Sequence, residues 1–283
     1  MKTKTFQKSD ARGAKYAMLT AYDALTSGIL EGAGVDFILV GDSVGMVLLG
    51  YPNTAMVTMD EMLHHSKAVR RGAPKSFILG DLPKKGIVKG PAQTLASARR
   101  FVAEASLDGV KLEWSKDCLM STELMVRHKI LVQGHVGLTP QAVKNKSGFK
   151  VQGKDASSAL EIIRQAKAFE DAGASLLLME CVPWEVAQII TNSLRIPTIG
   201  IGAGPYCDGQ VLVFHDLIGM FQGYTPKFVK HYAETGIASQ KAAAGYVRDV
   251  RAGRFPGLDQ SFRMDAAQLA KLRELMPAGG KKR

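Results

Sequence analysis

Eight short apolar runs, separated by longer amphipathic stretches, divide most of this chain of 283 residues. Each run ends at a glycine or a polar residue, and this alternation is typical of a βαβα fold. The runs are rich in Ile, Leu and Val without strict alternation, as a parallel sheet covered on both faces requires. Eight such strands favour a single closed (β/α)8 TIM barrel, of class α/β, over an open doubly wound sheet. The predicted strands are Ala17–Thr20, Phe37–Val40, Phe77–Leu79, Val110–Glu113, Ile130–Val132, Leu176–Met179, Ile196–Ile199 and Val211–Phe214.

The segments between these runs carry the start and stop signals of helices. Residues 58–61 read as a capping box, Pro91 stands where a first-turn proline is tolerated, and Gly173 ends another apolar stripe. No linker interrupts this pattern. We therefore expect a barrel domain over residues 1–255 with a basic N-terminal arm, followed by a C-terminal helix and a basic tail over residues 256–283.

Polar and charged side chains stand at the ends of the predicted strands. Catalytic residues of barrel enzymes lie at the C-terminal ends of the strands, so we expect these side chains to converge on one mouth. Lys111 precedes Glu113 by two positions and therefore points to the same side of its strand. The converging residues are Asp42 with Ser43, Asp81, Lys111 with Glu113, His135 and Glu180.

Three successive strands end in a carboxylate, namely Asp42, Asp81 and Glu113. Each aspartate taken alone can be the N-cap of the following helix. Together the three would repel one another unless a cation lay between them. Oxygen ligands without cysteine, and with at most one histidine, suit Mg²⁺. The pattern therefore favours a magnesium site, and Glu180, farther round the barrel, is expected to act as a base.

The formal net charge of +11 admits a nucleic-acid partner, but its distribution argues against one. Seven of the eleven excess charges lie in residues 1–15 and 276–283, where solvated arms are the usual interpretation. A basic nucleic-acid-binding or scaffold protein would also leave the converging carboxylates unexplained.

The cysteine pattern and the absence of long apolar windows bear on the compartment. Cys118, Cys181 and Cys207 form no CxxC pair, which favours a reducing compartment. No secretory h-region precedes Tyr16, and no window approaches 18 uninterrupted apolar residues. We expect a cytoplasmic enzyme with neither a membrane span nor a nucleic-acid partner.

Several motifs along the chain resemble those of one enzyme family. They are Leu19–Asp23 (LTAYD), Val40–Met46 (VGDSVGM), Arg70–Pro74, Lys111–Glu113, Gly134–Gln141 (GHVGLTPQ), Phe149–Gly153, Glu180–Pro183 and Ile199–Gly204. In this order they resemble ketopantoate hydroxymethyltransferase, from about Met18 to Gly223. The resemblance implies a Mg²⁺-dependent (β/α)8 barrel that assembles as a homo-oligomer, commonly a decamer. It also implies transfer of a one-carbon unit from 5,10-methylenetetrahydrofolate to the 2-keto acid 3-methyl-2-oxobutanoate, which gives 2-dehydropantoate for pantothenate biosynthesis.

The resemblance also assigns roles to the residues at the mouth. It implies that Asp42, Asp81 and Glu113 form the Mg²⁺ site and that Glu180 is the proton acceptor. Ser43 and Lys111, with the two aspartates, would hold the keto acid. Our own addition is His135, expected to stabilise developing oxyanion charge or to relay a proton.

One stretch departs from the family pattern, and one other enzyme class stays open. Residues 84–90 read KKGIVKG where the family usually has Phe and a Ser- or Tyr-containing stretch, so the contacts made there and the specificity stay open. The alternative function is a Mg²⁺-dependent carbon–carbon lyase or mutase of the phosphoenolpyruvate mutase and isocitrate lyase type. Those enzymes have a nucleophile loop resembling Lys-Cys-Gly-His. None of the three cysteines of this chain lies in such a motif, which counts against this alternative.

Overall fold

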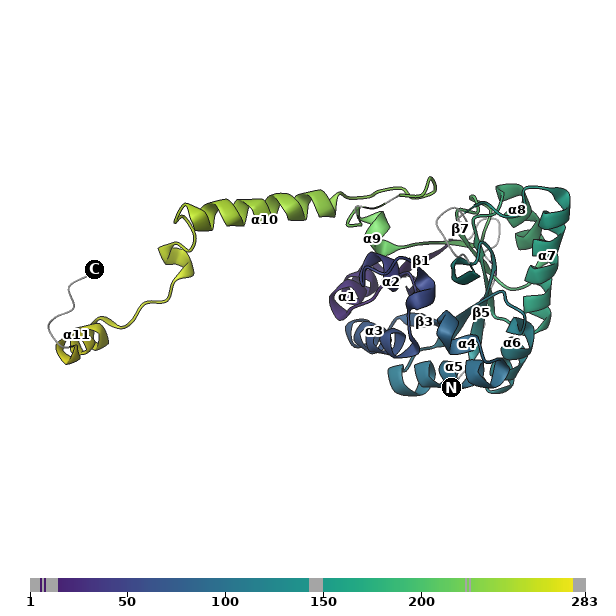
Figure 1. The fold of residues 1–283 in the computed structure, drawn as a ribbon, viewed down its shortest axis with the longest axis horizontal. Helices are drawn as coiled ribbons and strands as arrows, with labels where there is room; N and C mark the ends of the chain where they lie inside the picture. The colour runs from purple at the N-terminus through teal and green to yellow at the C-terminus, as the bar shows by residue number, and fades with distance from the viewer. Residues whose placement is uncertain are drawn as a thin grey trace. The chain divides into compact units, whose positions relative to one another are not determined.

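A closed barrel of eight parallel strands forms the centre of the structure, a computed structural model that describes residues 6, 8, 15–142, 150–221, 223 and 225–276. Each strand pairs with the next, and the eighth pairs with the first. The predicted TIM barrel is therefore confirmed (Figure 1). Its strands are β1 (Tyr16–Thr20), β2 (Phe37–Val40), β3 (Phe77–Asp81), β4 (Gly109–Glu113), β5 (Leu131–Gly137), β6 (Leu176–Glu180), β7 (Thr198–Ile201) and β8 (Gly209–Leu212).

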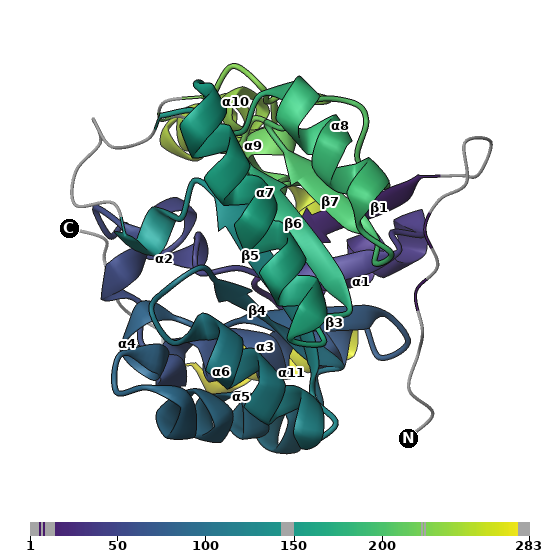
Figure 2. The same ribbon diagram turned by 90° about the vertical axis from the view of Figure 1, so that its right-hand side faces the viewer.

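Helices cover the outside of the barrel, and α3, α5 and α6 lie next to one another along one side (Figure 2). The capping box predicted at residues 58–61 is present at the start of α3. The described helices of this unit are α1 (Ala24–Ala33), α2 (Val44–Val47), α3 (Met59–Gly72), α4 (Lys84–Ile87), α5 (Pro91–Ala105), α6 (Cys118–Arg127), α7 (Ala156–Asp171), α8 (Trp184–Ser193) and α9 (Phe214–Leu217). Two short 3-10 turns, η1 (Thr54–Met56) and η2 (Pro140–Ala142), lie in the loops.

The strand boundaries differ from the apolar runs at several ends. β5 continues to Gly137, two residues past His135, the predicted end of the fifth strand, because inward-facing polar residues continue the strand beyond the apolar run. β7 begins two residues later than predicted, after Pro197, which has no N–H to give to a sheet. Phe214 begins α9 instead of ending β8.

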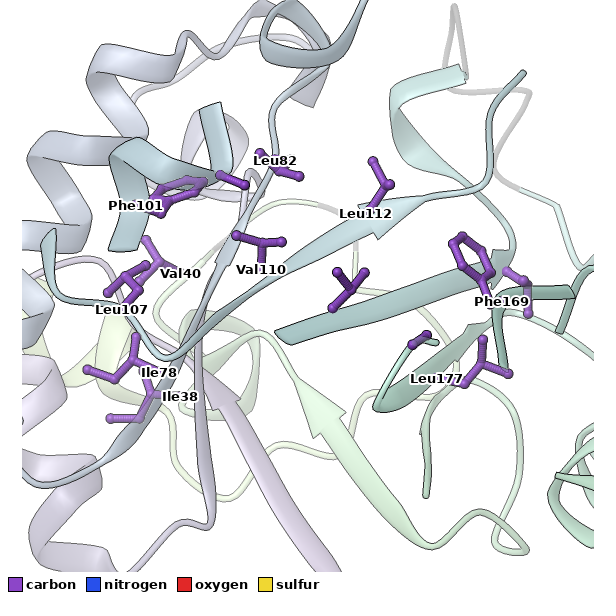
Figure 3. Close-up of a cluster of buried hydrophobic side chains, with 14 of the residues drawn as sticks. Ile38, Val40, Ile78, Leu82, Phe101, Leu107, Val110, Leu112, Phe169 and Leu177 are labelled. Atoms are coloured by element: carbon purple, nitrogen blue, oxygen red, sulfur yellow. The ribbon is translucent and has the colours of Figure 1, made fainter. Parts of the chain in front are cut away.

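Two hydrophobic clusters lie on opposite faces of the barrel wall. Phe37 and Leu39 of β2 belong to one cluster, and Ile38 and Val40 belong to the other. The cluster with Ile38 and Val40 also contains the inner side chains of the helices, so it fills the space between strands and helices. The cluster with Phe37 and Leu39 fills the barrel interior. Figure 3 shows part of the outer cluster, with Phe101 of α5 and Phe169 of α7 among side chains of the strands.

The inward-facing side chains of the strands determine where the acidic residues lie. Along β3, Phe77, Leu79 and Asp81 share one face, and along β6 Leu176, Leu178 and Glu180 do the same. Apolar side chains fill the lower barrel, and the last inward residue of each of these strands is acidic. The carboxylates therefore form the top layer of the same stack that forms the interior core.

The chain divides into two compact units, Met1–Ala233 and Glu234–Arg283. The second unit contains α10 (Thr235–Arg251) and α11 (Ala266–Leu275), and neither helix has a buried residue. The boundary predicted after residue 255 stays a prediction. Most of the N-terminal arm and the basic tail after residue 276 lie outside the described residues. No helix in the described part of the chain is long and apolar enough to cross a membrane.

Candidate active site

The side chains predicted at the strand ends lie together at the C-terminal mouth of the barrel. Asp81, Glu113 and Glu180 are the last residues of β3, β4 and β6, and Asp42 with Ser43 begins the loop after β2. Asp42, Asp81, Lys111, Glu113 and His135 are all buried, each with at most 5% of its surface exposed. The expected convergence of these residues is therefore present in the fold.

Lys111 provides the positive charge within this acidic group. Its Nζ atom lies 2.6 Å from Oδ2 of Asp81, in a buried ion pair. The same Oδ2 atom accepts a hydrogen bond from the backbone N–H of Asp42, at 3.2 Å. Burial lowers the pKa of Lys111, but attraction to Asp81, Asp42 and Glu113 outweighs burial and raises that pKa above its ordinary value. Lys111 is therefore a permanently charged ammonium group at the mouth.

Burial dominates the acidity of the carboxyl groups. It raises the pKa of Asp42 to about 7, with repulsion from Asp81 adding to the effect and Lys111 opposing it. It likewise raises the pKa of Glu180 to about 7, and that of Glu113 well above its ordinary value. More negative charge is concentrated here than Lys111 can balance, so the site favours a bound cation or proton.

His135 lies between two of the acids. Its Nε2 atom is 3.3 Å from Oε2 of Glu180, and its Nδ1 atom is 3.6 Å from Oε1 of Glu113. Burial, assisted by repulsion from Lys111, lowers the pKa of His135 well below its ordinary value, so the imidazole is neutral. A neutral imidazole has one N–H and one lone pair, so it can donate to only one of the two carboxylates.

Ser43 is held by a residue that the sequence interpretation did not single out. The hydroxyl groups of Tyr22 and Ser43 lie 2.8 Å apart, and Tyr22 is fully buried after β1. Its ring stacks on His215 at a centroid distance of 5.3 Å. The N-cap alternative for Asp42 does not hold, because the N-cap of α2 is Ser43 and the Asp42 carboxylate instead accepts a hydrogen bond from Gln141.

Gln141 is a second residue that the sequence interpretation missed as an individual. It lies in η2, after β5, and its side chain and backbone contact Asp42, Glu113 and Leu82. A buried glutamine within a Thr-Pro-Gln turn gives no periodic signal, so only the fold brings it to the carboxylates. The segment 84–90, whose sequence departs from the family pattern, also reaches this turn. Lys84 Nζ donates a hydrogen bond to the carbonyl of Gln141 at 2.8 Å.

The donor set fits a small, hard cation such as Mg²⁺. Oδ1 of Asp81 and Oε1 of Glu113 are buried and make no hydrogen bond within the described residues. No three His, Cys, Asp or Glu side chains in the described part of the chain are grouped closely enough to bind one ion together. Mg²⁺ keeps several waters and needs only one or two carboxylates, and the carboxyl groups of Asp42 and Asp81 are close enough to interact directly. Asp42 and Asp81 are therefore the pair that fits a Mg²⁺ ion, and Glu113 is near enough to interact electrostatically with both of them.

Comparison with known proteins gives consistent results along the chain. The family model for ketopantoate hydroxymethyltransferase matches residues 1–258. The 3-methyl-2-oxobutanoate hydroxymethyltransferase of Enterococcus faecalis is 45% identical over 268 residues, which are 95% of this chain and 98% of the relative. The enzyme of the same name from Oleidesulfovibrio alaskensis is 47% identical over 266 residues, 93% of this chain and 92% of the relative.

Solved structures agree in fold. A 2,3-dimethylmalate lyase, described as a PEP mutase/isocitrate lyase superfamily member, superposes with a TM-score of 0.57 at 16% identity, covering 93% of this chain and 90% of the lyase. Identity this low shows a shared barrel and does not extend to the reaction. The family model, in contrast, matches residues 1–258, and the curated relatives cover more than 90% of the chain at 45% and 47% identity. The chain therefore belongs to the ketopantoate hydroxymethyltransferase family.

Proposed function

We propose that this protein transfers a one-carbon unit from 5,10-methylenetetrahydrofolate to 3-methyl-2-oxobutanoate, giving 2-dehydropantoate and tetrahydrofolate. One water is consumed, and its oxygen becomes the new hydroxyl group. The observation that carries the proposal is the grouping of three buried carboxyl groups, with Glu180 beside them, around Lys111 in a chain of this family. Membership of the family favours this transfer over the lyase or mutase alternative.

Lys111 and Ser43 would bind the keto acid. The buried ammonium group of Lys111 lies among these carboxylates, so it would attract the substrate carboxylate. Ser43, held by Tyr22, would donate a hydrogen bond to the substrate. Asp42 and Asp81 stand beside this pair and would help to hold the keto acid at the mouth.

Asp42, Asp81 and Glu113 would hold Mg²⁺. When bound there, Mg²⁺ would supply Lewis acidity to the keto oxygen of the substrate. The cation would also offset the repulsion that raises the pKa of Asp42.

Glu180 would remove the proton from C3 of the keto acid. Breaking this C–H bond leaves its electron pair in the enolate, and the proton goes to the carboxylate of Glu180. Water replaces the two C–N bonds that hold the one-carbon unit on the folate, which releases tetrahydrofolate with both water hydrogens on its nitrogens and leaves the carbon as a formaldehyde-level C=O group. C3 then forms a C–C bond to this carbon as the C=O π bond breaks, and the oxygen takes up the proton held by Glu180 to become the new hydroxyl group. A pKa near 7 suits a general base at neutral pH, because the group is substantially ionised and still basic. His135, neutral and 3.3 Å from Glu180, would orient that carboxylate and relay its proton.

We also propose that the protein is a cytoplasmic homo-oligomer, with a decamer as the expected size. Exposed apolar side chains in the second unit support self-association, among them Tyr246, Leu258 and Phe262. Size-exclusion chromatography with light scattering tests this, and a stable monomer would contradict it.

The decisive experiment follows the C3 hydrogen of 3-methyl-2-oxobutanoate in D2O by NMR, with Mg²⁺ present. We expect the wild type to exchange this hydrogen and, with methylenetetrahydrofolate added, to form 2-dehydropantoate. Glu180→Gln should lose both activities, and Glu123→Gln, at an exposed position on α6, should keep them. Absence of exchange by the wild type would contradict the proposed function, and full exchange by Glu180→Gln would remove Glu180 as the base.

A further inference from the structure

Gln141 connects the three carboxylate-bearing segments of the mouth. Its Nε2 atom donates hydrogen bonds of 2.9 Å to Oδ2 of Asp42 and of 2.9 Å to the carbonyl of Leu82, next to Asp81. Its backbone N–H donates to Oε2 of Glu113 at 3.2 Å. The side chain is buried, with 4% of the residue exposed. One residue therefore contacts the loops after β2 and β3 and the end of β4.

The chemistry of the amide fixes its orientation. The amide nitrogen carries two hydrogens, and Asp42 and Leu82 accept one each. The flipped amide would point its oxygen at a carboxylate and a carbonyl, which repel it. Oε1 is buried and makes no hydrogen bond within the described residues, so it is an acceptor that a bound water or ligand can use.

These contacts orient both carboxylates. Because Gln141 engages Oδ2 of Asp42 and Oε2 of Glu113, the second oxygen of each acid is turned away from the turn. Oε1 of Glu113 is buried without a hydrogen bond among the described residues. A carboxylate with one oxygen bound in this way presents the other in a defined direction, as the outer partners of metal ligands do.

Lys84 hydrogen-bonds to the backbone of Gln141. It begins α4, three residues after Asp81, and its Nζ atom donates to the carbonyl of Gln141 at 2.8 Å. Gln141 donates in return to the carbonyl of Leu82, so the turn η2 and the loop after β3 are joined by two reciprocal hydrogen bonds. Lys85 makes a similar bond from the same helix, but to the carbonyl of Met56 in η1 instead of to Gln141.

We propose that Gln141 is a positioning residue that presents Asp42 and Glu113 to the cation, and that Lys84 holds Gln141 in place. This inference rests on the proposed function, since it assumes that the mouth binds Mg²⁺. It assigns a role to the segment 84–90, which differs from the family pattern. Lys84 donates a hydrogen bond to the turn η2, and an apolar side chain at that position would have no donor.

The test measures Mg²⁺ affinity directly, by isothermal titration calorimetry on the full chain, together with kcat and the KM for Mg²⁺. Gln141→Leu should weaken Mg²⁺ binding about 10- to 100-fold, as loss of an outer partner commonly does, with kcat at saturating Mg²⁺ changed less than about threefold. Lys84→Met should weaken it about threefold, because the Gln141 side chain remains. The matched controls Gln165→Leu on α7 and Lys85→Met on α4 should bind as the wild type does.

The outcomes separate this proposal from the proposed function. A wild type that binds no Mg²⁺ would overturn both. Wild-type binding with unchanged affinity in folded Gln141→Leu would overturn the positioning role alone, as would a loss of kcat at unchanged Mg²⁺ affinity. If Gln141→Leu does not fold, Lys84→Met decides. It retains the apolar stem of a half-buried side chain, and an affinity equal to that of Lys85→Met would overturn the proposal.

Discussion

The carboxylate of Glu180 and the imidazole of His135 face each other across the paired strands β5 and β6, with Oε2 and Nε2 3.3 Å apart. The other ring nitrogen faces Glu113 at 3.6 Å. Because the neutral imidazole has a single N–H, one nitrogen presents a lone pair to a carboxyl group. That contact is favourable only when the carboxyl group is protonated. The raised pKa values of Glu113 and Glu180 are consistent with one shared proton in this trio.

The first prediction concerns the pH dependence of C3 hydrogen exchange. Glu180 acts as a base only when ionised, and its pKa is raised to about 7, chiefly by burial. The rate of exchange should therefore rise about tenfold per pH unit below pH 6 and level off above about pH 8. NMR exchange rates at saturating keto acid and Mg²⁺ measure this. A rate that is flat from pH 5 to pH 8 would exclude Glu180 as the titrating base.

The second prediction concerns stability, measured without metal. Between pH 4.5, the ordinary pKa of Glu180, and about pH 7, its pKa in the fold, the native state holds more protons than the unfolded state. The free energy of unfolding should therefore fall as pH rises through this window, by about 3 kcal/mol for this group. Denaturant unfolding at pH 5 and pH 8 should show a smaller fall for Glu180→Gln than for the wild type. Equal falls in the two proteins would show that Glu180 titrates normally.

The sequence predicts the barrel and most of the mouth because both follow from short patterns. Uninterrupted apolar runs identify buried parallel strands, and the residue that ends each run must lie at the C-terminal face. Asp42, Asp81, Glu113, His135 and Glu180 were found in this way, and all five lie together.

The remaining features depend on contacts between residues distant in sequence. Tyr22 hydrogen-bonds to Ser43 and Gln141 hydrogen-bonds to Asp42, over separations of 21 and 99 residues. The raised pKa of Asp42 depends on the depth of burial, which no local pattern encodes. β5 ends two residues later than the His135 predicted, because inward polar residues interrupt the apolar run and no local pattern shows where the strand stops.

The third prediction concerns the positive charge of Lys111. Lys111→Met should raise the KM for the keto acid about 10- to 100-fold, because truncating one partner of a buried charge pair commonly costs 2 kcal/mol or more. It also leaves Asp81 without its ion pair, so the variant should be less stable. Lys67→Met, which breaks an exposed ion pair with Glu104, is the control and should change neither value. An unchanged KM would remove Lys111 from substrate binding.

The fourth prediction concerns Tyr22 as the support of Ser43. Tyr22→Phe keeps the ring and its stacking on His215 but removes the hydroxyl that lies 2.8 Å from the Ser43 hydroxyl. Loss of one hydrogen bond, worth about 1 kcal/mol, should raise the KM for the keto acid about fivefold. The comparison variant is Tyr51→Phe, which loses a hydrogen bond to Glu61 outside the mouth. If both variants have wild-type KM values, Tyr22 does not position Ser43.

The last prediction tests how the backbone places Glu180. Gly137, at the end of β5, has φ 93, and a Cβ added there would lie 2.3 Å from the backbone carbonyl oxygen of Glu180. Gly34 has φ 77, and a Cβ there would meet nothing within 4 Å. Gly34→Ala should therefore show only the cost of positive φ, about 1 kcal/mol in the free energy of unfolding.

Gly137→Ala carries the same cost and must also move the strand that bears the base. It should lose more stability and at least about tenfold in C3 exchange, since such displacements of catalytic groups are costly. Equal stability and equal exchange in the two variants would mean that the close approach of Gly137 to Glu180 has no part in positioning the base.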